Sequence, residues 1–400
     1  MTAPPNIPVH MRRRIFDLDA HVRGLRVREP LSRITLPRGV QVWVATSHSL
    51  IRRVFGDPET FGSSGRGRSD PAHGGDGSHP PSEPADRHGN ITEYDPPEHR
   101  RLRALLAPEF SAKRTRVMAP LVEEIITDQV QQMLDAGPPT DLVESFSMPI
   151  PSRVICALLG IPYADRAGFQ QRSRQRFNLL LPVHVRQDAE RRSRAYMDEF
   201  IAQQRVDPGE ALIGRLVREH GQDIDDRELA GIADILLLGG YETTAHMLSL
   251  GTLLLLLNPP YWDLIRDGQH VTEIIEEMLR YLSVVQTGVP RVARRDVELS
   301  GHHIRAGEWV HCSLPAGNRD QLFGEDPDSF QPTRGANTHL AFGYGIHYCL
   351  GASLARMELR AAFTALTRQV PDLRLDLPAG PIRFRHYAAV YGLDSLPVRW

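Results

Sequence analysis

The stretch Phe342-Gly-Tyr-Gly-Ile-His-Tyr-Cys-Leu-Gly351 places one cysteine, Cys349, in a glycine-rich loop directly before a long helical pattern. Glycines let the backbone turn tightly and approach a flat cofactor where any Cβ atom would collide. The N–H groups and the positive dipole end of the following helix stabilise a cysteine sulfur as an anion. The arrangement predicts a thiolate that binds iron, with Phe342 covering the sulfur and His347 adding a polar donor. The simpler alternative is a buried free cysteine beside a tight turn.

A second segment, residues 226–257, is apolar on nearly all sides and predicts one long buried helix. Asp225 precedes it as an N-cap, and the prolines after Asn258 end it. Its middle contains Gly239-Gly-Tyr-Glu-Thr-Thr244, where each glycine weakens the helix by about 1 kcal/mol relative to alanine. A threonine hydroxyl there can bond the carbonyl four residues back. An acid followed by an alcohol at such an opening suits proton delivery during the reduction of dioxygen; the alternative is a helix kink with buried polar residues.

Two further motifs have helical spacing. Glu277 and Arg280 are three residues apart and share one helix face, although most such pairs are solvated and worth under about 1 kcal/mol. His99 and Arg103 are four residues apart and can reach a common anion. Four other arginines predict either a docking patch for an acidic electron donor or a merely solvated basic face: Arg100, Arg101, Arg356 and Arg360.

In this order along the chain, the motifs resemble those of the cytochrome P450 family. The cysteine loop matches the family's Phe-x-x-Gly-x-basic-x-Cys-x-Gly pattern, and the helix centre resembles its Ala/Gly-Gly-x-Glu/Asp-Thr motif. The resemblance covers nearly the whole chain, with Tyr241 where histidine is common and His347 where arginine is common. It implies a mainly α fold with minor β structure and haem b (iron protoporphyrin IX) between the long central helix and the cysteine-ligand loop.

The resemblance also implies roles for single residues. Cys349 is expected to ligate the iron, Thr243 to lie beside the oxygen, and Glu242 to lie on a proton relay to solvent. The expected haem contacts come from the cysteine loop and from basic side chains that bind propionates: Phe342, Gly343, Gly351, His99, Arg103, Arg291 and His347. The expected structural network consists of Glu277, Arg280 and Arg334. The expected substrate pocket includes Leu236, Gly240, Val285, Val289 and Ala389.

Composition places the chain among ordinary globular proteins, since 41% of its 400 residues are hydrophobic and 24% are charged. A formal net charge of −2 gives no argument for a nucleic-acid partner. Three cysteines form neither a disulfide framework nor a zinc site, and the N-terminal residues show no signal peptide or membrane anchor, which predicts a cytoplasmic protein.

Residues 1–400 are expected to form a single domain, because no linker or repeat divides them. Residues 62–91, rich in Gly, Ser, Pro, Asp and His, predict a lid-like loop or, more simply, a flexible surface insertion. Strand patterns occur near residues 31–45, 291–313 and 383–399. Helical patterns occur near residues 47–56, 97–107, 114–135, 142–159, 186–204, 226–257, 271–282 and 350–369.

The implied reaction is insertion of one oxygen atom from O2 into a C–H or C=C bond of a bulky small molecule, as in actinobacterial enzymes that tailor secondary metabolites. Electrons from NAD(P)H are expected through an external ferredoxin and its reductase, because the sequence has no flavin or iron–sulfur segment. Two alternatives stay open. One is a haem-thiolate oxidase that couples phenols or oxidises without oxygen insertion. The other is a haem-binding sensor or carrier, which would need the cysteine loop but not the acid–alcohol pair. A monomer is the default state, and nothing in the sequence selects a substrate.

Overall fold

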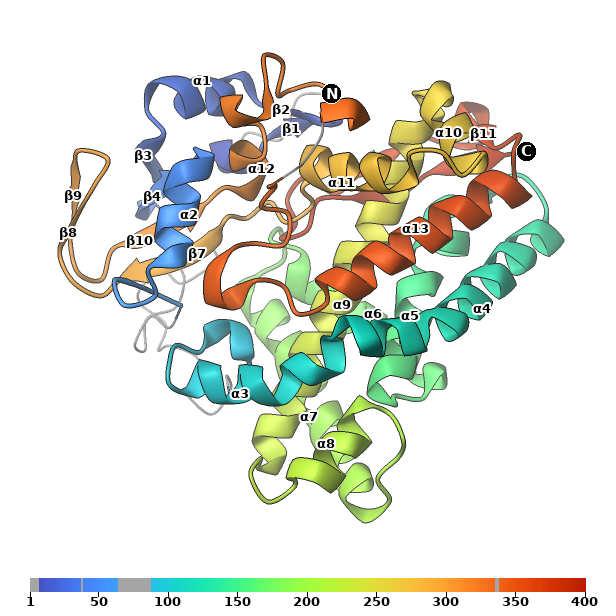
Figure 1. Cartoon of the computed structure of the whole chain (residues 1–400), viewed down its shortest axis with the longest axis horizontal. Helices are drawn as coiled ribbons and strands as arrows, with labels where there is room; N and C mark the ends of the chain where they lie inside the picture. Colours follow the sequence, from blue (N-terminus) through green and yellow to red (C-terminus); the bar gives the residue numbers. More distant parts are fainter. Residues whose placement is uncertain (1–6, 37–38, 64–87, 335–337) are drawn as a thin grey trace.

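The computed structural model describes residues 7–36, 39–63, 88–334 and 338–400. Helices dominate this part of the chain, and the short strands form small separate sheets, most of which lie at the left of Figure 1; this confirms the predicted fold class. The helices are α1 (Ala20–Arg28), α2 (His48–Gly56), α3 (Glu98–Leu106), α4 (Ala112–Ala136), α5 (Pro149–Leu159), α6 (Arg166–Phe177), α7 (Val183–Val206), α8 (Leu212–His220), α9 (Asp226–Leu256), α10 (Pro259–Arg266), α11 (Val271–Leu282), α12 (Leu314–Gly317) and α13 (Ala352–Gln369).

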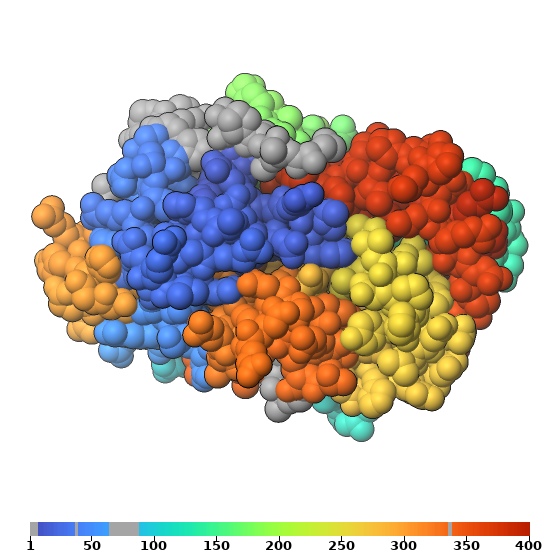
Figure 2. Space-filling model, turned by 90° about the horizontal axis from the view of Figure 1, so that it is seen from above, coloured from blue at the N-terminus to red at the C-terminus, as the bar shows by residue number. Residues whose placement is uncertain are grey.

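The strands are short. They are β1 (Arg13–Arg14), β2 (Asp17–Leu18), β3 (Leu31–Thr35), β4 (Gln41–Ala45), β5 (Phe61–Gly62), β6 (Thr140–Asp141), β7 (Val289–Ala293), β8 (Val297–Leu299), β9 (His302–Ile304), β10 (Trp309–Cys312), β11 (Arg374–Leu375), β12 (Arg383–Phe384), β13 (Leu393–Ser395) and β14 (Pro397–Arg399). The largest sheet has the order β3-β4-β10-β7-β5. In it, β10 runs parallel to β4 with Val310 opposite Trp43. Figure 2 shows the same association, with N-terminal residues (blue) beside residues of the last third of the chain (orange).

Helix α9 runs through the middle of the molecule (Figure 1). Its 31 residues correspond to about 46 Å at 1.5 Å per residue. Asp225 caps it as predicted, because its carboxylate accepts the Glu228 backbone N–H at 2.8 Å. Helices α5, α7 and α13 pack against it, so side chains around its whole circumference are buried. This central position brings residues near its glycine pair close to the loop before α13.

Five helices were not predicted from the sequence: α1, α6, α8, α10 and the short α12. In α6 only Phe169 and Ser173 are buried, so its arginine- and glutamine-rich sequence carries almost no apolar periodicity. The expected helix at 142–159 is divided into a π-turn at Val143–Ser147 and α5, which starts at Pro149. Proline suits this first helical position because the N–H that it lacks would have no partner within the helix.

Most of the predicted loop at 62–91 lies outside the described residues. At its C-terminal end, the His88 carbonyl accepts a hydrogen bond from Arg194 Nη2 at 2.7 Å, and His88 Nε2 lies 3.2 Å from Asp225 Oδ2. This end is therefore attached to α7 and to the start of α9. Within the described ranges, no helix combines the length and apolar character that a bilayer crossing requires.

Candidate active site

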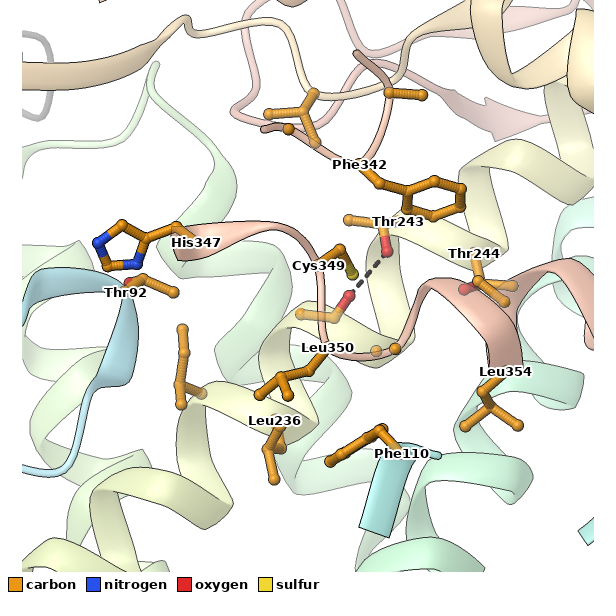
Figure 3. Close-up of a pocket in the computed structure, with 18 of the residues that line it drawn as sticks. Thr92, Phe110, Leu236, Thr243, Thr244, Phe342, His347, Cys349, Leu350 and Leu354 are labelled. Carbon is orange, nitrogen blue, oxygen red and sulfur yellow. Dashed lines mark hydrogen bonds between the residues drawn. The ribbon is translucent and has the colours of Figure 1, made fainter. Parts of the chain in front are cut away.

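A cavity of about 370 Å³ lies between α9 and the loop that precedes α13. Figure 3 shows Thr243, His347 and Cys349 among the side chains that line it. Most of the other lining side chains are apolar, and they come from α5, α9 and the segment after α11. The cavity includes four of the five residues predicted for a substrate pocket: Leu236, Gly240, Val285 and Val289. The fifth, Ala389, is buried and is not among the described residues at the cavity.

The cysteine loop is shaped by two left-handed glycines, Gly343 (φ 73°) and Gly345 (φ 74°). A Cβ atom at Gly345 would lie 2.3 Å from the Phe55 carbonyl oxygen, so only glycine fits there. The Cys349 N–H donates to the Phe342 carbonyl at 3.0 Å and closes the loop. Its sulfur is thereby presented just before α13 begins.

The Cys349 side chain is exposed to the cavity, although protein surrounds the site as a whole. Burial raises the pKa of its thiol, while the Gly351 N–H, Arg103 and Arg356 act in the opposite direction. The free thiol is therefore protonated at neutral pH. A metal ion that binds here must displace that proton and then bind the thiolate.

One wall of the cavity is basic and contains all four predicted propionate ligands: His99, Arg103, Arg291 and His347. Burial, followed by the neighbouring charge of Arg291, lowers the pKa of His347 to about 3. Burial likewise lowers the pKa of His99, Arg103 and Arg291. A negatively charged ligand group at this wall would offset the desolvation of all four side chains.

Two further contacts define this wall. His99 Nε2 is buried and has no hydrogen-bond partner among the described residues. His347 Nε2 lies 2.8 Å from the Ser63 hydroxyl, so the described start of the 62–91 segment touches the basic wall. The nearby carboxylate of Asp95 binds Arg294 and accepts the Ser63 N–H at 2.8 Å.

These features fit an iron porphyrin. A Cβ atom added at Gly343 or Gly351 would meet nothing within 4 Å, so both glycines leave open space beside the sulfur for a flat ring. Arginine side chains suit carboxylates such as propionates. The apolar lining suits the hydrocarbon ring, and the cysteine is the residue that would supply the iron ligand.

The two members of the acid–alcohol pair of α9 lie in different surroundings. Thr243 lines the cavity, and its hydroxyl donates to the Gly239 carbonyl at 2.7 Å (dashed line in Figure 3). Glu242 is fully buried and is not among the described residues at the cavity. Neighbouring positions of a helix point about 100° apart, so the two side chains face different surroundings. Glu242 therefore lies behind the cavity wall.

Glu242 instead belongs to a buried cluster with Arg385 and His246. Arg385 Nη1 donates to Glu242 Oε2 at 2.6 Å, and His246 Nε2 lies 3.5 Å from the same oxygen. Burial alone would raise the pKa of Glu242, but Arg385 and His246 together keep it below the ordinary value. The four-residue spacing from Glu242 to His246 was visible in the sequence, whereas the approach of Arg385, just after β12, was not.

Glu358 on α13 is a cavity residue that the motifs did not indicate. It is buried, and its Oε1 has no hydrogen-bond partner among the described residues. Burial raises the pKa of Glu358 to about 8. This carboxyl group is therefore largely neutral at pH 7 and can donate a hydrogen bond into the cavity. In the sequence, the only indication of Glu358 as a cavity residue was that a single acidic residue interrupts an otherwise apolar helix face.

Behind the cysteine loop lies the predicted network of Glu277, Arg280 and Arg334. Arg280 Nε and Nη2 bind the Glu277 carboxylate, each at 2.7 Å. Arg334 Nε binds Glu277 Oε1 at 3.0 Å. Arg280 is fully buried and also donates to the carbonyls of Asn318, Pro327 and Ser329. The network joins α11 to the chain segment that leads into the cysteine loop.

The neighbouring Glu276 has separate partners. Its carboxylate accepts hydrogen bonds from Arg356 Nε at 2.6 Å and Nη2 at 2.9 Å, and from His339 Nε2 at 3.1 Å. Burial alone would raise the pKa of Glu276, but the bonds from His339 and Arg356 lower it to about 2. Arg101 is also paired, with Glu228. Two of the four arginines of the expected basic patch are therefore engaged within the protein.

The lowered pKa of Glu276 predicts an acid-dependent loss of stability. Because the folded-state value lies below the unfolded one, the stabilisation is complete above about pH 4.5 and is lost as the pH falls towards about 2. A shift of this size corresponds to at most about 3 kcal/mol, and solvent screening reduces it because the side chain is 23% exposed. Urea unfolding of Glu276→Gln should show a shallower dependence on acid pH than the wild type. The exposed Glu273→Gln serves as control and should follow the wild type; equal slopes for all three proteins would contradict the prediction.

Comparison with known proteins agrees with this geometry. Residues 140–369 match the family model described as "Cytochrome P450". The chain belongs to the cytochrome P450 family and is an oxidoreductase of the haem-thiolate type. This confirms the resemblance seen in the sequence motifs.

Three similar proteins illustrate the range within the family. The vitamin D3 dihydroxylase of Streptomyces griseolus is 40% identical over 384 residues, which cover 93% of this chain and 91% of that protein. The structure of CYP105P1 in complex with filipin I has a TM-score of 0.91 and 35% identity, and covers 100% of this chain and 99% of that one. The structure of OxyC, implicated in an oxidative C–C coupling reaction during vancomycin biosynthesis, has a TM-score of 0.85 and 37% identity, covering 99% and 97%.

Proposed function

We propose that this cytochrome P450 inserts one oxygen atom from O2 into a C–H or C=C bond of a bulky, largely apolar molecule of secondary metabolism. The observation that carries the proposal is one apolar cavity that receives both the Cys349 sulfur and the Thr243 hydroxyl. The dihydroxylase relative and the filipin-bound structure support a small-molecule substrate of this kind.

The residues divide the work between binding, water exclusion and proton supply. When bound, haem activates dioxygen, and electron donation by the Cys349 thiolate favours O–O cleavage. Leu236, Gly240 and Val285 exclude water from the cavity and orient the substrate. Thr243 donates its own proton to the Gly239 carbonyl, so its oxygen is free to accept a hydrogen bond from the cavity. We assign Glu242 to the proton relay from solvent, a role in which its carboxylate must release Arg385 before it can take up a proton.

The electron supply and the cellular setting are part of the same proposal. Electrons arrive from NAD(P)H through an external ferredoxin and its reductase, which places the enzyme in the cytoplasm. Residues 1–400 act as one monomeric domain. Arg100 and Arg360 are the arginines of the basic patch that we assign to donor docking.

The role of Thr243 is tested by Thr243→Val, which keeps the side-chain shape and removes the hydroxyl. The valine side chain has no oxygen to accept a hydrogen bond from the cavity, and a group positioned for proton transfer contributes 10²- to 10⁴-fold in general, so we expect coupled product formation to fall roughly 100-fold. NAD(P)H oxidation should continue with release of hydrogen peroxide. The measurement is the ratio of product to NAD(P)H consumed. Thr243→Ser should retain most of the coupling, and full coupling in the valine variant would sink the proposed role.

The basic wall is tested by Arg103→Leu. An ionic hydrogen bond to a buried propionate is worth about 1.5–3 kcal/mol, so haem should leave the variant roughly 10- to 100-fold faster than the wild type. The rate is measured by haem transfer to an excess of apomyoglobin. Arg100→Leu removes an exposed charge from the same helix and should release haem at the wild-type rate. Equal rates for the two variants would remove Arg103 from the haem site.

The likeness to OxyC supports a second candidate function, oxidative coupling of phenols without oxygen insertion. Turnover under ¹⁸O2 separates the two reactions once a substrate is found. Monooxygenation gives a product that carries one labelled atom. Coupling gives an unlabelled product that has lost two hydrogen atoms.

A further inference from the structure

Arg356 lies on α13, seven residues after Cys349. Its guanidinium makes the two hydrogen bonds to Glu276 described above, and its carbon atom lies 4.5 Å from the centre of the Phe342 ring. Its Nη1 also lies 3.3 Å from the Tyr348 hydroxyl. Arg356 therefore touches the cysteine loop at two points, at its start (Phe342) and directly before the sulfur ligand (Tyr348).

The pair of Glu276 and Arg356 is mostly shielded from solvent, since the side chains are 23% and 25% exposed. Bidentate binding and ring contact leave the guanidinium little freedom to reach another protein. Its charge therefore acts mainly inside the molecule. This separates Arg356 from surface arginines that serve electron-donor docking.

The second residue that binds Glu276 is His339. The Ala341 N–H donates to His339 Nδ1 at 3.2 Å, so Nδ1 is the acceptor and Nε2 carries the proton that faces Glu276. With one carboxylate, one guanidinium and one neutral imidazole, the cluster has no net charge. Removing either charged partner uncovers a single charge of known sign behind the cysteine loop.

We propose that the Glu276–Arg356 pair sets the electrostatic potential behind Cys349 and thereby tunes the reduction potential of the haem iron. Charges and hydrogen bonds around a ligating sulfur are established controls of reduction potential. A positive charge near the iron stabilises the reduced state, which has one more electron, and a negative charge destabilises it. The proposal rests on Cys349 as the haem ligand. It makes Glu276 and Arg356 positioning residues that act through the loop.

The test is a spectroelectrochemical titration of substrate-free holoenzyme. Glu276→Gln leaves Arg356 uncompensated and should raise the midpoint potential. Arg356→Gln leaves Glu276 uncompensated and should lower it. The double variant has no uncovered charge and should return towards the wild-type value. Arg360→Gln removes an equal charge one turn further along α13 and should shift the potential less than either single variant.

The proposal would be overturned if both single variants shifted the midpoint potential in the same direction, or if neither shifted it. A pair that only held the loop in place mechanically would not give opposite shifts on loss of its positive and its negative partner. If Arg356→Gln does not retain haem, Arg356→Lys keeps the charge without the bidentate geometry. The lysine variant should then stay closer to the wild-type potential than to that of Glu276→Gln. A carbon monoxide difference spectrum, recorded first for every variant, shows whether Cys349 is the ligand at all. A failure of the ligand assignment is thus distinguished from a failure of the tuning role.

Salt dependence separates tuning from donor docking. The rate at which a negatively charged ferredoxin reduces the enzyme is measured at increasing ionic strength. If Arg356 acts inside the protein, this rate should depend on ionic strength as steeply in the Arg356→Gln variant as in the wild type. A flatter dependence would assign Arg356 to the docking surface and would contradict an internal role.

Discussion

Replacing Cys349 by alanine is expected to abolish the strongly red-shifted Soret band of the reduced, carbon monoxide-bound protein and, with it, product formation. The sulfur is the group that the loop presents to the cavity as an iron ligand. The fold should survive, because the loop is closed by the backbone bond from the Cys349 N–H to the Phe342 carbonyl. The free energy of unfolding of the haem-free variant should therefore lie within about 0.5 kcal/mol of that of the haem-free wild type.

Cys156→Ala is the matched control for this experiment. Cys156 is buried in α5, and burial raises the pKa of its thiol to about 12, which makes it a poor metal ligand. This variant should lose some stability through the cavity it creates and keep the red-shifted band. A red-shifted band in Cys349→Ala, or its absence in well-folded, haem-loaded wild type, would refute Cys349 as the ligand.

Replacing Arg280 by leucine should have the largest effect on stability. The change leaves the Glu277 carboxylate without its bidentate partner and removes the donor from three backbone carbonyls. Breaking a buried ion pair in this way lowers the free energy of unfolding by about 3–5 kcal/mol. This is a large part of the roughly 5–15 kcal/mol by which a typical folded protein is stable. Chemical unfolding of the purified variant measures the loss.

The pair of Arg266 and Asp263 provides the comparison. It has the same three-residue spacing, but its side chains are 37% and 54% exposed, so Arg266→Leu should cost less than about 1 kcal/mol. Arg280→Lys keeps the charge without the planar fork and should fall between the two leucine variants. Equal losses for Arg280→Leu and Arg266→Leu would show that burial adds nothing to this network.

Motifs whose parts lie close together in the sequence were predictable. The cysteine loop is short enough that glycine positions alone indicate its turns, and Gly343 and Gly345 do adopt left-handed conformations. The cap of α9 is equally local, because Asp225 and the N–H that it binds are three residues apart. Each of these features depends on backbone geometry within one or two turns of chain.

Contacts between distant segments were not predictable in this way. Helical spacing placed Glu242 beside Thr243 in the chain, but the direction of the Glu242 side chain is fixed by Arg385. Arg356 likewise looked like a surface charge until its partner Glu276 was located on α11. His311 is fully buried in β10, which lies between β4 and β7 in a sheet built from distant parts of the chain. Periodicity in a single sequence indicates local helices and strands, but it does not indicate which distant segments contact one another.

The buried imidazole of His246 restricts what protein engineering can do elsewhere in the chain. A Cβ atom at Gly392 would lie 2.1 Å from the Cγ and Nδ1 atoms of that ring, which is fully buried and contacts Arg385. A side chain at position 392 therefore becomes acceptable only together with a smaller residue at position 246. A mutant library for this enzyme should randomise the two positions jointly, because varying position 392 alone would yield mostly misfolded protein.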